Sequence, residues 1–296
     1  MLYRFLWIFF IYAFLGWCTE VSYAALVTGK FVNRGFLNGP WCPVYGFGVL
    51  IVLAGLTPLS DNLLLLFLGS VVLTSTLEWL TGFVLEKLFH QRWWDYSDEP
   101  FNLSGYICLR FSVAWGFACL FVVKLLHPTV LLFIRLIPRG LGIVLLALLG
   151  GVMAVDLAAT VSTIVKLNRR LAQIDELAAK IKEASNEFGE NLADRVLDAA
   201  ERGAEWKEDL DELAFKLSER RAELADQREE WEQRREEHSA QVRRQLEEWR
   251  QAMQELHDGE FFGRRRLLRA FPRLRSIDHG GALERLRRRM ETFRKP

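Results

Sequence analysis

The chain has few of the residues and motifs that carry catalysis or hold a metal. It contains four cysteines and five histidines in 296 residues. There is no CxxC pair, no Cys/His cluster at metal-ligand spacing and no GxxxxGK[ST] phosphate loop for ATP hydrolysis. The histidines lie outside the apolar segments, so Ser/His/Asp catalysis has no support there. We therefore expect no catalytic site, no metal site and no cofactor, and we interpret the cysteines as small apolar residues.

The N-terminal sequence does not predict a cleavable signal peptide. The apolar run from Leu2 to Val27 is too long for a signal sequence, and no small-residue cleavage pattern follows it. It predicts a first membrane-spanning helix, which needs about 20 mostly apolar residues. Five segments meet or approach that length: 3–28, 43–60, 62–88, 103–126 and 140–167.

Proline and glycine interrupt the apolar sequence between the first two segments. The stretch Gly35–Pro43 contains two prolines and two glycines, which prevent a continuous helix. It is too apolar for an ordinary soluble loop, so we expect a re-entrant or membrane-surface loop that is buried in protein or lines a cavity. Thr129–Ile137 is too short to span a membrane. We expect an interfacial helix there, with a sixth, broken span as the alternative.

The formal net charge of +1 hides three unlike blocks. Residues 1–165 carry nine basic and eight acidic residues, residues 166–263 carry 17 and 26, and residues 264–296 carry 12 and three. The chain is thus a membrane domain, an acidic arm and a basic tail. We expect these parts at residues 1–167, 168–260 and 261–296.

Basic residues in the short loops predict the orientation of the membrane domain. The loops after the first, third and fifth expected spans carry seven Lys or Arg residues, and the opposite side carries four. By the positive-inside rule, the N-terminus lies outside and the arm lies in the cytoplasm. We expect a multi-pass protein of the bacterial plasma membrane.

The acidic arm has no proline and little glycine between Leu167 and about His257. Apolar residues recur there at spacings of three and four, typical of a long amphipathic helix with coiled-coil character. This stripe comprises Leu167, Leu171, Ile174, Leu177, Ile181, Leu210, Leu213, Leu217, Leu224 and Trp231. A helix of about 90 residues would reach about 135 Å, so we expect the arm to fold back or to oligomerise. Gly189 and Gly203 are the candidate breaks.

The basic tail alternates Arg with Leu and Phe, which predicts short amphipathic helices around Pro272 and Gly280–Gly281. Together with the arm and the membrane domain, this defines the fold class. We expect an all-α protein with a polytopic transmembrane bundle of about five spanning helices and one broken loop, followed by a long cytoplasmic helical arm.

Ionisable residues interrupt four of the apolar segments: Glu20, Glu78, Arg110 and Asp156. A charge at membrane depth costs about 2.5–3.5 kcal/mol on insertion scales, so such a residue usually faces a bundle interior and pairs with another group. Arg110 cannot lose its charge, and each of the three carboxylates is a candidate partner, in a structural or a substrate-binding pair. The small residues Gly150–Gly151 predict close helix contact that buries Asp156.

Glu78, Gly82 and Glu86 repeat every four residues and therefore lie on one helix face. Gly82 would let another helix pack between the two carboxylates, and paired carboxylates suit the binding of a cation or a proton. The alternative is structural, with Glu78 paired to Arg110 and Glu86 at the membrane interface.

Two loops add further candidate site residues. Arg34 offers a fork of donors that suits phosphate or carboxylate, and Asn33 lies beside it. The alternative for this loop is a tight turn with Arg34 on lipid headgroups. In the second loop, a Trp-Trp pair resembles an interfacial aromatic belt. Asp95 and Asn102 follow it and would shape a mouth above the bundle, unless the segment is only an interfacial anchor.

Several short motifs in the first half of the chain resemble those of one bacterial membrane family. They are Gly16-Trp17 with Glu20, Asn33-Arg34-Gly35-Phe36-Leu37 with Gly39-Pro40, Pro43-Val44-Tyr45-Gly46-Phe47-Gly48, Leu77-Glu78-Trp79 with Thr81-Gly82, Glu86-Lys87, Trp93-Trp94-Asp95-Tyr96, Phe101-Asn102-Leu103 and Ile107-Cys108-Leu109-Arg110. In this order they make residues 3–167 resemble the ABC-transporter type IV permease-like family. The resemblance implies a small multi-spanning domain that works with a separate ATPase. The extension after Lys166 departs from it and suggests an added cytoplasmic interaction module.

We therefore predict a permease-like subunit with a polar intramembrane site, in a lipid bilayer. It would form a homo-oligomer, because five helices are few to enclose a path. The alternative is a membrane-anchored scaffold or sensor that acts through the arm and through a basic tail on anionic lipid. Positive charge alone does not specify nucleic acid, which we do not expect as a partner. A lipid-modifying enzyme, with Arg34 on phosphate and Glu78 as base, lacks a nucleophile.

Overall fold

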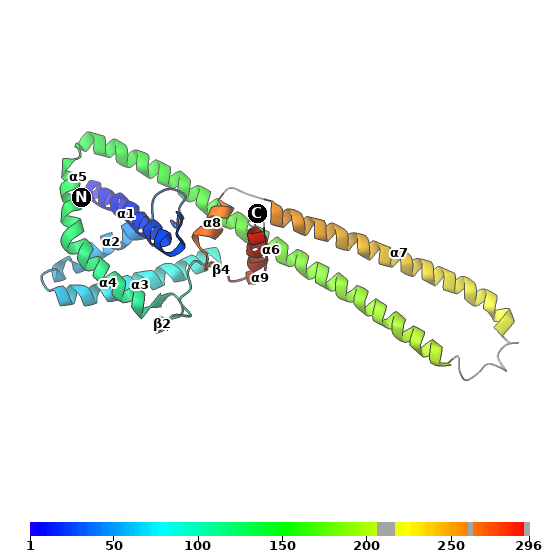
Figure 1. The fold of residues 1–296 in the computed structure, drawn as a ribbon. Helices are drawn as coiled ribbons and strands as arrows, with labels where there is room; N and C mark the ends of the chain where they lie inside the picture. Colours follow the sequence, from blue (N-terminus) through cyan, green and yellow to red (C-terminus); the bar gives the residue numbers. More distant parts are fainter. Residues whose placement is uncertain (206–216, 260–262, 293–296) are drawn as a thin grey trace. The chain divides into compact units, whose positions relative to one another are not determined.

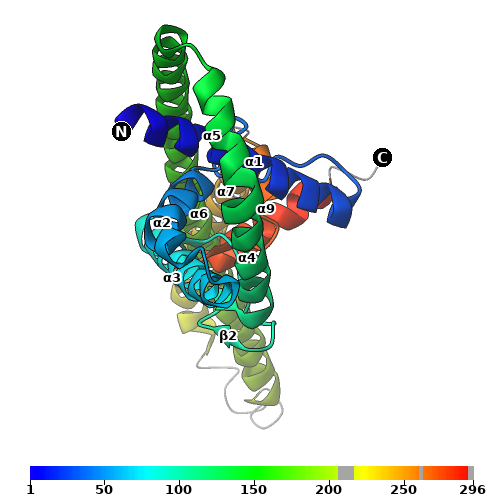
Figure 2. The same cartoon turned by 90° about the vertical axis from the view of Figure 1, so that its left-hand side faces the viewer.

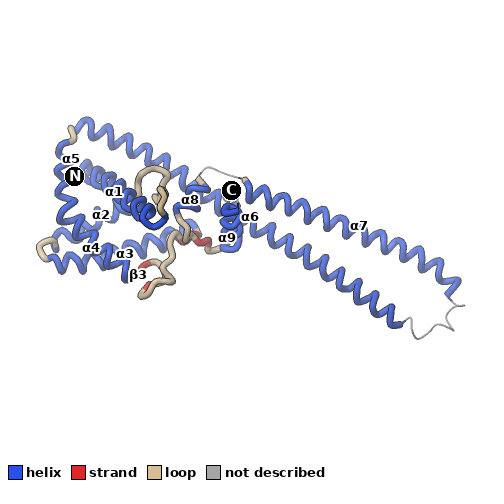
Figure 3. Tube along the Cα trace, in the orientation of Figure 1, coloured by secondary structure: helices blue, strands red, loops and turns tan. Residues whose placement is uncertain are grey.

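The computed structural model describes residues 1–205, 217–259 and 263–292, and helices dominate this part of the chain (Figures 1 and 3). The long helices are α1 (Leu2–Thr28), α2 (Pro43–Leu56), α3 (Leu63–Phe89), α4 (Leu109–Phe121), α5 (His127–Leu136), α6 (Arg139–Glu205) and α7 (Leu217–Asp258). The shorter elements are β1 (Gln91–Arg92), β2 (Asn102–Leu103), β3 (Ile107–Cys108), α8 (Arg264–Ala270), β4 (Arg275–Ser276) and α9 (Gly280–Thr292). The predicted all-helical class is confirmed.

Two compact units make up the chain. The first, here called the membrane unit, comprises Met1–Arg169 and Glu260–Pro296, and the second, the arm unit, comprises Arg170–Gly259. The C-terminal segment therefore belongs with the membrane helices, whereas the sequence blocks had set it apart as a tail of its own.

Four helices of the structure are long and apolar enough to cross a membrane: Leu2–Thr28, Leu63–Phe89, Leu109–Leu136 and Arg139–Asn186. A shorter apolar helix, Pro43–Leu59, includes α2 and one 3₁₀ turn. Many large apolar side chains on these helices point outward, among them Leu26, Val72 and Val155. A helix with an apolar exterior and internally bonded backbone is the form that is stable in lipid.

One helix occupies the region of the predicted fourth span and the predicted interfacial helix. α4 continues through the π-helical turn Val122–Leu126 into α5, as one column in Figure 2. Pro128 lies in the first turn of α5. A proline removes one backbone donor from a helix, and the wider π turn accommodates that loss. The expectation of a separate helix or a sixth span at Thr129–Ile137 is therefore wrong.

Glycines let α1 and α2 pack at short range. A Cβ at Gly16 would lie 2.3 Å from the ring of Tyr45, and one at Gly46 would lie 2.6 Å from the ring of Phe9. A larger residue at either position would push the two helices apart. This close contact holds Tyr45 against α1, where it becomes part of the site described below.

The arm unit folds back on itself (Figure 1), which is one of the two arrangements expected from its length. α6 runs unbroken through Gly189 and Gly203, so the expectation of a break there is wrong. A glycine inside a helix costs only about 1 kcal/mol relative to alanine, which a long helix tolerates. Arg170 of α6 donates to the carbonyls of Leu256, at 3.3 Å, and Gly259 near the end of α7. The two ends of the arm unit therefore meet.

Buried positions along α6 follow the predicted spacing. Ile164, Leu167, Leu171 and Ile174 are each 0% exposed, and two further positions of the stripe are half-buried. Residues Leu210 and Leu213 lie outside the described residues. The side chains of three further stripe positions are also outside the described part of the chain: Leu217, Leu224 and Trp231.

The C-terminal segment packs through two short helices on either side of Pro272, as predicted. β4 pairs antiparallel with β1, directly after α3, with Gln91 opposite Ser276. Leu267, Leu274 and Leu286 are at most 1% exposed. The alternation of Arg and Leu therefore buries its apolar face in the membrane unit.

The loops after α1 and α3 lie at the same end of the membrane helices as the point where α6 leaves them. The rings of Phe36 and Trp93 lie 5.1 Å apart and join the two loops. The side-chain amide of Asn168, on α6, donates to the carbonyl of Phe89 at 2.7 Å. The structure thus gathers at one end the loops in which the basic residues are more numerous.

Truncation after Arg169 should destabilise the membrane unit, whereas deletion of residues 170–259 with a short Gly/Ser linker should not. Truncation removes β4 and the buried leucines, but the deletion joins two ends that already meet. We expect truncation to lower the midpoint of thermal unfolding in detergent by about 6 °C or more, against a change of at most about 2 °C for the joined chain. Equal midpoints for both would contradict the packing of the C-terminal segment.

Candidate functional site

Asp156 of α6 holds the loop between α1 and α2. Its carboxylate accepts hydrogen bonds from the backbone of Asn38 at 3.0 Å and of Gly39 at 2.7 Å. The side-chain amide of Asn38 donates at 2.9 Å, and the indole of Trp41 donates at 3.0 Å. Because a buried charge is tolerated only when it is hydrogen-bonded, these four donors explain how α6 can carry an aspartate in an apolar run.

Asn33 orders the same loop from within. Its side-chain oxygen accepts from the indole of Trp17 at 2.8 Å and from the backbone of Gly35 at 3.1 Å. Its amide nitrogen donates to the carbonyl of Asn38 at 2.7 Å. The non-helical stretch after α1 is thus partly buried, with Leu37 at 0% exposed, and several of its backbone groups are bonded.

Arg266 of α8 reaches the loop from the C-terminal segment. Its guanidinium donates to three successive carbonyls, those of Gly35 at 2.9 Å, Phe36 at 3.0 Å and Leu37 at 2.8 Å. Burial lowers the pKa of Arg266, while the charge of Asp156 opposes that effect. The fixed fork of an arginine can bond several acceptors at once, so one side chain fixes three residues of the loop.

Glu20 of α1 meets partners from the loop and from α2. The Nε atom of Arg34 lies 3.6 Å from one carboxylate oxygen of Glu20, and the hydroxyl of Tyr45 donates to the other at 2.6 Å. The guanidinium of Arg34 also lies 5.4 Å from the ring centre of Tyr23. Arg34 therefore pairs with a carboxylate of the bundle.

Glu78 of α3 is less completely bonded. The hydroxyl of Tyr96 donates to one of its oxygens at 3.3 Å, while the other oxygen is buried without a hydrogen-bond partner among the described residues. Burial raises the pKa of Tyr96, and the charges of Glu78 and Glu20 raise it further. We call the two carboxylates and the side chains that bond them the carboxylate centre: Glu20, Arg34, Tyr45, Glu78 and Tyr96.

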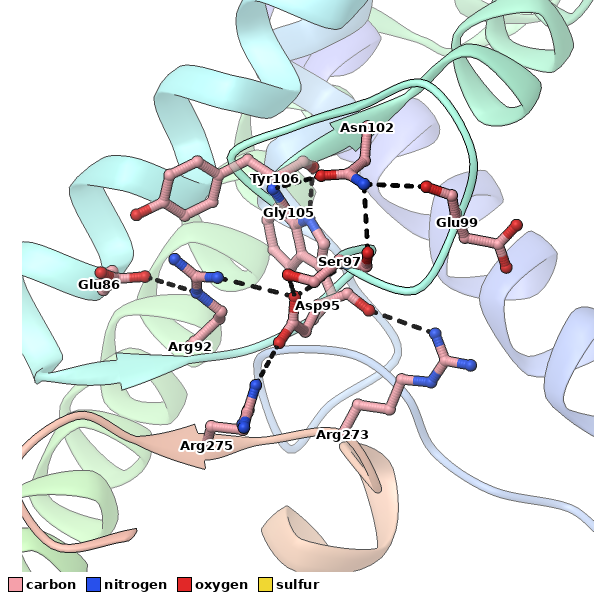
Figure 4. A network of polar contacts seen from close by, with 11 residues as sticks. Glu86, Arg92, Asp95, Ser97, Glu99, Asn102, Gly105, Tyr106, Arg273 and Arg275 are labelled. Carbon is pink, nitrogen blue, oxygen red and sulfur yellow. Dashed lines mark hydrogen bonds and ion pairs between the residues drawn. The ribbon is translucent and has the colours of Figure 1, made fainter.

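A second polar network occupies the loop between α3 and α4 (Figure 4). Arg92 donates from Nε to Glu86 at 2.8 Å, and its Nη1 lies 3.6 Å from Asp95. Its guanidinium also lies 4.7 Å from the ring centre of Tyr106. Arg92 thus connects the end of α3 with the loop that follows.

Asp95 connects this loop to the C-terminal segment (Figure 4). Its carboxylate accepts from the backbone and hydroxyl of Ser97, at 3.0 and 2.5 Å, and from Arg275 of β4 at 2.7 Å. Arg273 donates to the Asp95 carbonyl at 3.2 Å. Burial alone would raise the pKa of Asp95, but the bonds from Ser97 and Arg275 outweigh it and lower the pKa below its ordinary value.

Asn102 shapes the turn between β2 and β3. Its amide donates to the carbonyls of Ser97 at 3.2 Å and Glu99 at 2.8 Å, and its oxygen accepts from the backbone of Gly105 at 3.2 Å. Gly105 has φ 70°, in the left-handed region that favours glycine. A Cβ there would lie 2.6 Å from a carboxylate oxygen of Asp95, so the network requires glycine at this position.

Arg110 does not lie inside the bundle. α4 begins at Leu109, because residues 102–103 and 107–108 pair as a small antiparallel hairpin. Arg110 therefore stands exposed in the first turn of α4, 5.8 Å from the ring centre of Phe111. Within the described residues it forms no ion pair with a carboxylate, so the expected pairing with an intramembrane carboxylate is wrong.

Two expectations about glycines are also wrong. A Cβ at Gly82 would lie 2.7 Å from the ring of Tyr106 and 3.1 Å from that of Trp94, so loop aromatics cover the face on which another helix was expected. Gly150–Gly151 have nothing within 4 Å of their Cβ positions, so close helix contact does not bury Asp156. The loop after α1 instead covers part of Asp156 and bonds its carboxylate.

The predicted site residues fall into separate groups. Asn33 joins Asp156 through Asn38, Arg34 joins Glu20, and Asn102 lies with Glu86 and Asp95. Glu78 lies near the second group, and Arg110 stands apart. Within the described ranges, no three His, Cys, Asp or Glu side chains lie close enough to hold a metal ion.

Sequence reasoning missed four residues of these groups: Tyr45, Tyr96, Arg266 and Arg275. Tyr45 stands among apolar residues and Tyr96 follows a Trp-Trp pair, so both look like core or interfacial aromatics. The two arginines stand among many others in the C-terminal segment, with no signal that separates them. The one available signal is that Tyr45 and Tyr96 both lie within the motifs quoted for the family resemblance.

The apolar helices, four of them long enough to cross a bilayer, define a helical membrane protein. Residues 7–161 match the family described as "Putative ABC-transporter type IV". The match spans more than half of the chain, which therefore belongs to this family, as the sequence motifs predicted. No curated protein and no solved structure matches the chain significantly.

Replacement of Asp156 by asparagine should loosen the loop after α1. The variant loses the negative charge that strengthens four hydrogen bonds. One of its two terminal side-chain atoms is an amide nitrogen, which donates and therefore cannot accept from the loop. We expect a loss of about 2 kcal/mol of stability, seen as a midpoint of thermal unfolding lower by about 4–8 °C. Asp61→Asn is the matched control, because Asp61 is exposed in the turn before α3. Equal midpoints for the two variants would contradict the role of Asp156.

Stability should depend on the ionisation of Asp95. The pKa of Asp95 is lower in the folded protein than its ordinary value of 3.8. The unfolded chain therefore binds the proton first, so the stabilisation is complete above about pH 5 and is lost as the pH falls below 3.8 towards about pH 3. Unfolding midpoints measured between these pH values should fall more in the parent protein than in Asp95→Asn. Parallel pH profiles would contradict this assignment.

Proposed function

We propose that this protein is the permease-like subunit of a transporter, and that the carboxylate centre is its functional site. One observation carries the proposal. Two carboxylates on apolar helices, Glu20 of α1 and Glu78 of α3, are each bonded by a tyrosine hydroxyl, and one oxygen of Glu78 is buried without a partner among the described residues. Ionisable residues at membrane depth are expensive and usually mark a path for ions or substrates.

The charges of this centre favour a cation or a proton as the species that it binds. The carboxylate centre contains two carboxylates and one arginine, which pairs with Glu20, so it carries one uncompensated negative charge when all three groups are ionised. Like charges in a poorly solvated site repel, and a bound proton or cation relieves the repulsion. The unpartnered oxygen of Glu78 is the natural acceptor. The role is one of binding and passage rather than catalysis.

Membership of the family supports a separate ATPase as the partner, because the chain has no phosphate loop of its own. The outward-facing apolar side chains of the spanning helices support contact with lipid or with a second copy. A homo-oligomer would enclose a path that so few helices do not. The positive-inside rule favours the plasma membrane with the basic loops and the arm unit on the cytoplasmic side.

A membrane-anchored scaffold or sensor is the second candidate function. The observation in its favour is the arm unit, a long helical hairpin with an excess of acidic residues. Contact of the C-terminal arginines with anionic lipid is less favoured than the sequence suggested. Arg266 and Arg275 are engaged with the membrane unit itself.

Purification of the tagged protein in mild detergent, with mass spectrometry of co-purified proteins, tests the permease proposal. We expect a stoichiometric ATPase whose hydrolysis rate in liposomes depends on Glu78. Glu78→Gln should retain the ATPase but lower the rate by about tenfold, a usual size for coupling between sites. Arg110→Gln is the matched control, since Arg110 is a charged residue outside the carboxylate centre, and should change the rate by at most about twofold.

Absence of an ATPase, together with recovery of soluble partners, would favour the scaffold. The chain with residues 170–259 replaced by a linker decides between the two. A scaffold loses its partners in this variant, whereas a permease keeps the ATPase. Retention of every partner and full activity in Glu78→Gln would overturn the proposed site.

A further inference from the structure

Glu78 has a weaker set of partners than the other carboxylate of the centre. Glu20 has the cation of Arg34 at 3.6 Å and the hydroxyl of Tyr45 at 2.6 Å. Glu78 accepts one hydrogen bond, from the hydroxyl of Tyr96 at 3.3 Å, and forms no ion pair within the part of the chain that the structure describes. Its second oxygen is buried and has no partner there. A negative charge on Glu78 would therefore be poorly compensated.

Glu78 also lies far from both ends of its helix. It precedes the last residue of α3, Phe89, by eleven residues, which at about 1.5 Å per residue is about 16 Å. The loop after α3 covers it through Tyr96. A buried carboxylate without full hydrogen bonding costs far more free energy than the neutral acid, which leaves only one hydroxyl unpaired. The position therefore favours the neutral form.

α4 brings two aromatic side chains to the carboxylate centre. Phe111 and Trp115 are four residues apart and therefore lie on one face of this helix. The ring of Phe111 stacks on that of Tyr96 at 5.0 Å, and the ring of Trp115 meets that of Tyr45 edge-on at 5.7 Å. Each of these tyrosines bonds one of the two carboxylates. One uncharged face of α4 thus packs on both halves of the centre, and its low polarity raises the cost of a charge there.

Close packing fixes α4 against the helix that carries Glu78. A Cβ at Gly116 would lie 2.6 Å from the side chain of Val71 on α3. The hydroxyl of Ser75 donates to that of Ser112 at 2.7 Å, and Ser75 lies about one turn before Glu78 on α3. Both polar groups in this contact are uncharged hydroxyls. The contact between α3 and α4 therefore supplies no charge that would stabilise an ionised Glu78.

The other elements around Glu78 supply one cation, and it is already paired. The charged and titratable groups of these elements are Tyr96 and Cys108 between α3 and α4, Glu20 of α1, Arg34 and Cys42 of the loop after α1, and Tyr45 of α2. Arg34 pairs with Glu20. Arg110, in the first turn of α4, is exposed and forms no ion pair among the described residues. Neither arginine therefore balances a charge on Glu78.

The donor set around Glu78 suits a proton better than a metal ion. Magnesium and calcium ions take about six or more oxygen ligands. Here the described residues bring one further oxygen to Glu78, the hydroxyl of Tyr96. Across those same residues, no three His, Cys, Asp or Glu side chains lie close enough together to hold a metal ion. A proton needs only one free lone pair, which the buried oxygen of Glu78 offers.

We propose that Glu78 holds a proton in this structure while Glu20 stays ionised beside Arg34, so that a proton is the species that the carboxylate centre binds. Uptake attaches one proton from water to one oxygen of Glu78 and removes the uncompensated negative charge of the centre. Release returns the proton to water and leaves a carboxylate to which Tyr96 donates. Two carboxylates in unlike surroundings thus take unlike roles. The part of this proton in transport rests on the proposed function, but the protonation of Glu78 is measured without transport.

Infrared spectroscopy of the full-length protein in detergent tests the proposal. A protonated carboxylic acid has a carbonyl stretching band that ionised carboxylates lack and that shifts in deuterium oxide. Ordinary Asp and Glu side chains are ionised at neutral pH. We expect the acid band in the parent protein at neutral pH, and we expect it to disappear reversibly as the pH is raised. Absence of the band at neutral pH, or its persistence until the protein unfolds in alkali, would overturn the proposal.

Substitutions assign the band to one residue. Glu78→Gln should abolish it, and Glu78→Asp, which keeps a carboxyl group in a shorter side chain, should shift it. Glu20→Gln and Glu86→Gln are the matched controls and should retain it, because Glu20 and Glu86 are each paired with an arginine. Unfolding midpoints check that each variant is folded. A band that is unchanged in both Glu78 variants belongs to another residue and contradicts the assignment.

Salts separate a proton from other cations. The midpoint of thermal unfolding is compared in sodium, magnesium, calcium and choline chloride at equal ionic strength, for the parent protein and for Glu78→Gln. A cation that binds the folded protein raises its midpoint. We expect the four salts to act equally on both proteins. A salt that raises the midpoint of the parent but not that of Glu78→Gln would show that its cation occupies the site, against the proposal.

This inference and the proposed function fail in different ways. Absence of an ATPase partner would remove the transporter but would leave the acid band of Glu78 in place. Conversely, slower ATP hydrolysis in Glu78→Gln without an acid band in the parent protein would keep the site and exclude the proton as its ligand.

Discussion

The membrane unit depends on the bonding of a non-helical loop whose backbone cannot rely on water. A chain that leaves a helix within or beside a bilayer exposes donors and acceptors that each cost several kcal/mol if unmet. Here the carboxylate of Asp156 accepts from the backbone N–H groups of Asn38 and Gly39, and the guanidinium of Arg266 donates to the carbonyls of residues 35–37. An anion and a cation from different segments thus divide the two kinds of backbone group between them.

The same principle ranks the intramembrane carboxylates. Asp156 has four donors at 3.0 Å or closer and a fifth, the hydroxyl of Thr160, at 3.5 Å, and Glu20 has a hydroxyl and an arginine. Glu78 has one long hydrogen bond and an oxygen with no partner in the described residues. A fully bonded carboxylate is part of the fold, whereas an incompletely bonded one has capacity left for a ligand. This difference, rather than depth in the membrane, singles out Glu78.

Composition and spacing were sufficient for the long helices, the broken loop after α1 and the helical arm, because each follows from apolar length or from glycine and proline. The pairings were not predictable in this way. Arg110 lies outside the bundle because a turn at Ser104 and Gly105, both with positive φ, delays the start of α4. A hydropathy profile contains no information about the backbone φ angles that form such a turn. An alternation of Arg and Leu likewise predicts an amphipathic helix, but it does not tell whether the apolar face packs on lipid or on protein.

The two side chains that hold the loop after α1 lie on different sides of the boundary between family match and extension. The matched residues 7–161 contain Asn33, Arg34 and Asp156, so the loop and its contact with Asp156 belong to the shared domain. Arg266 lies outside the match. The inner contacts can therefore order the loop by themselves, and the C-terminal segment adds a second hold on a structure that already exists.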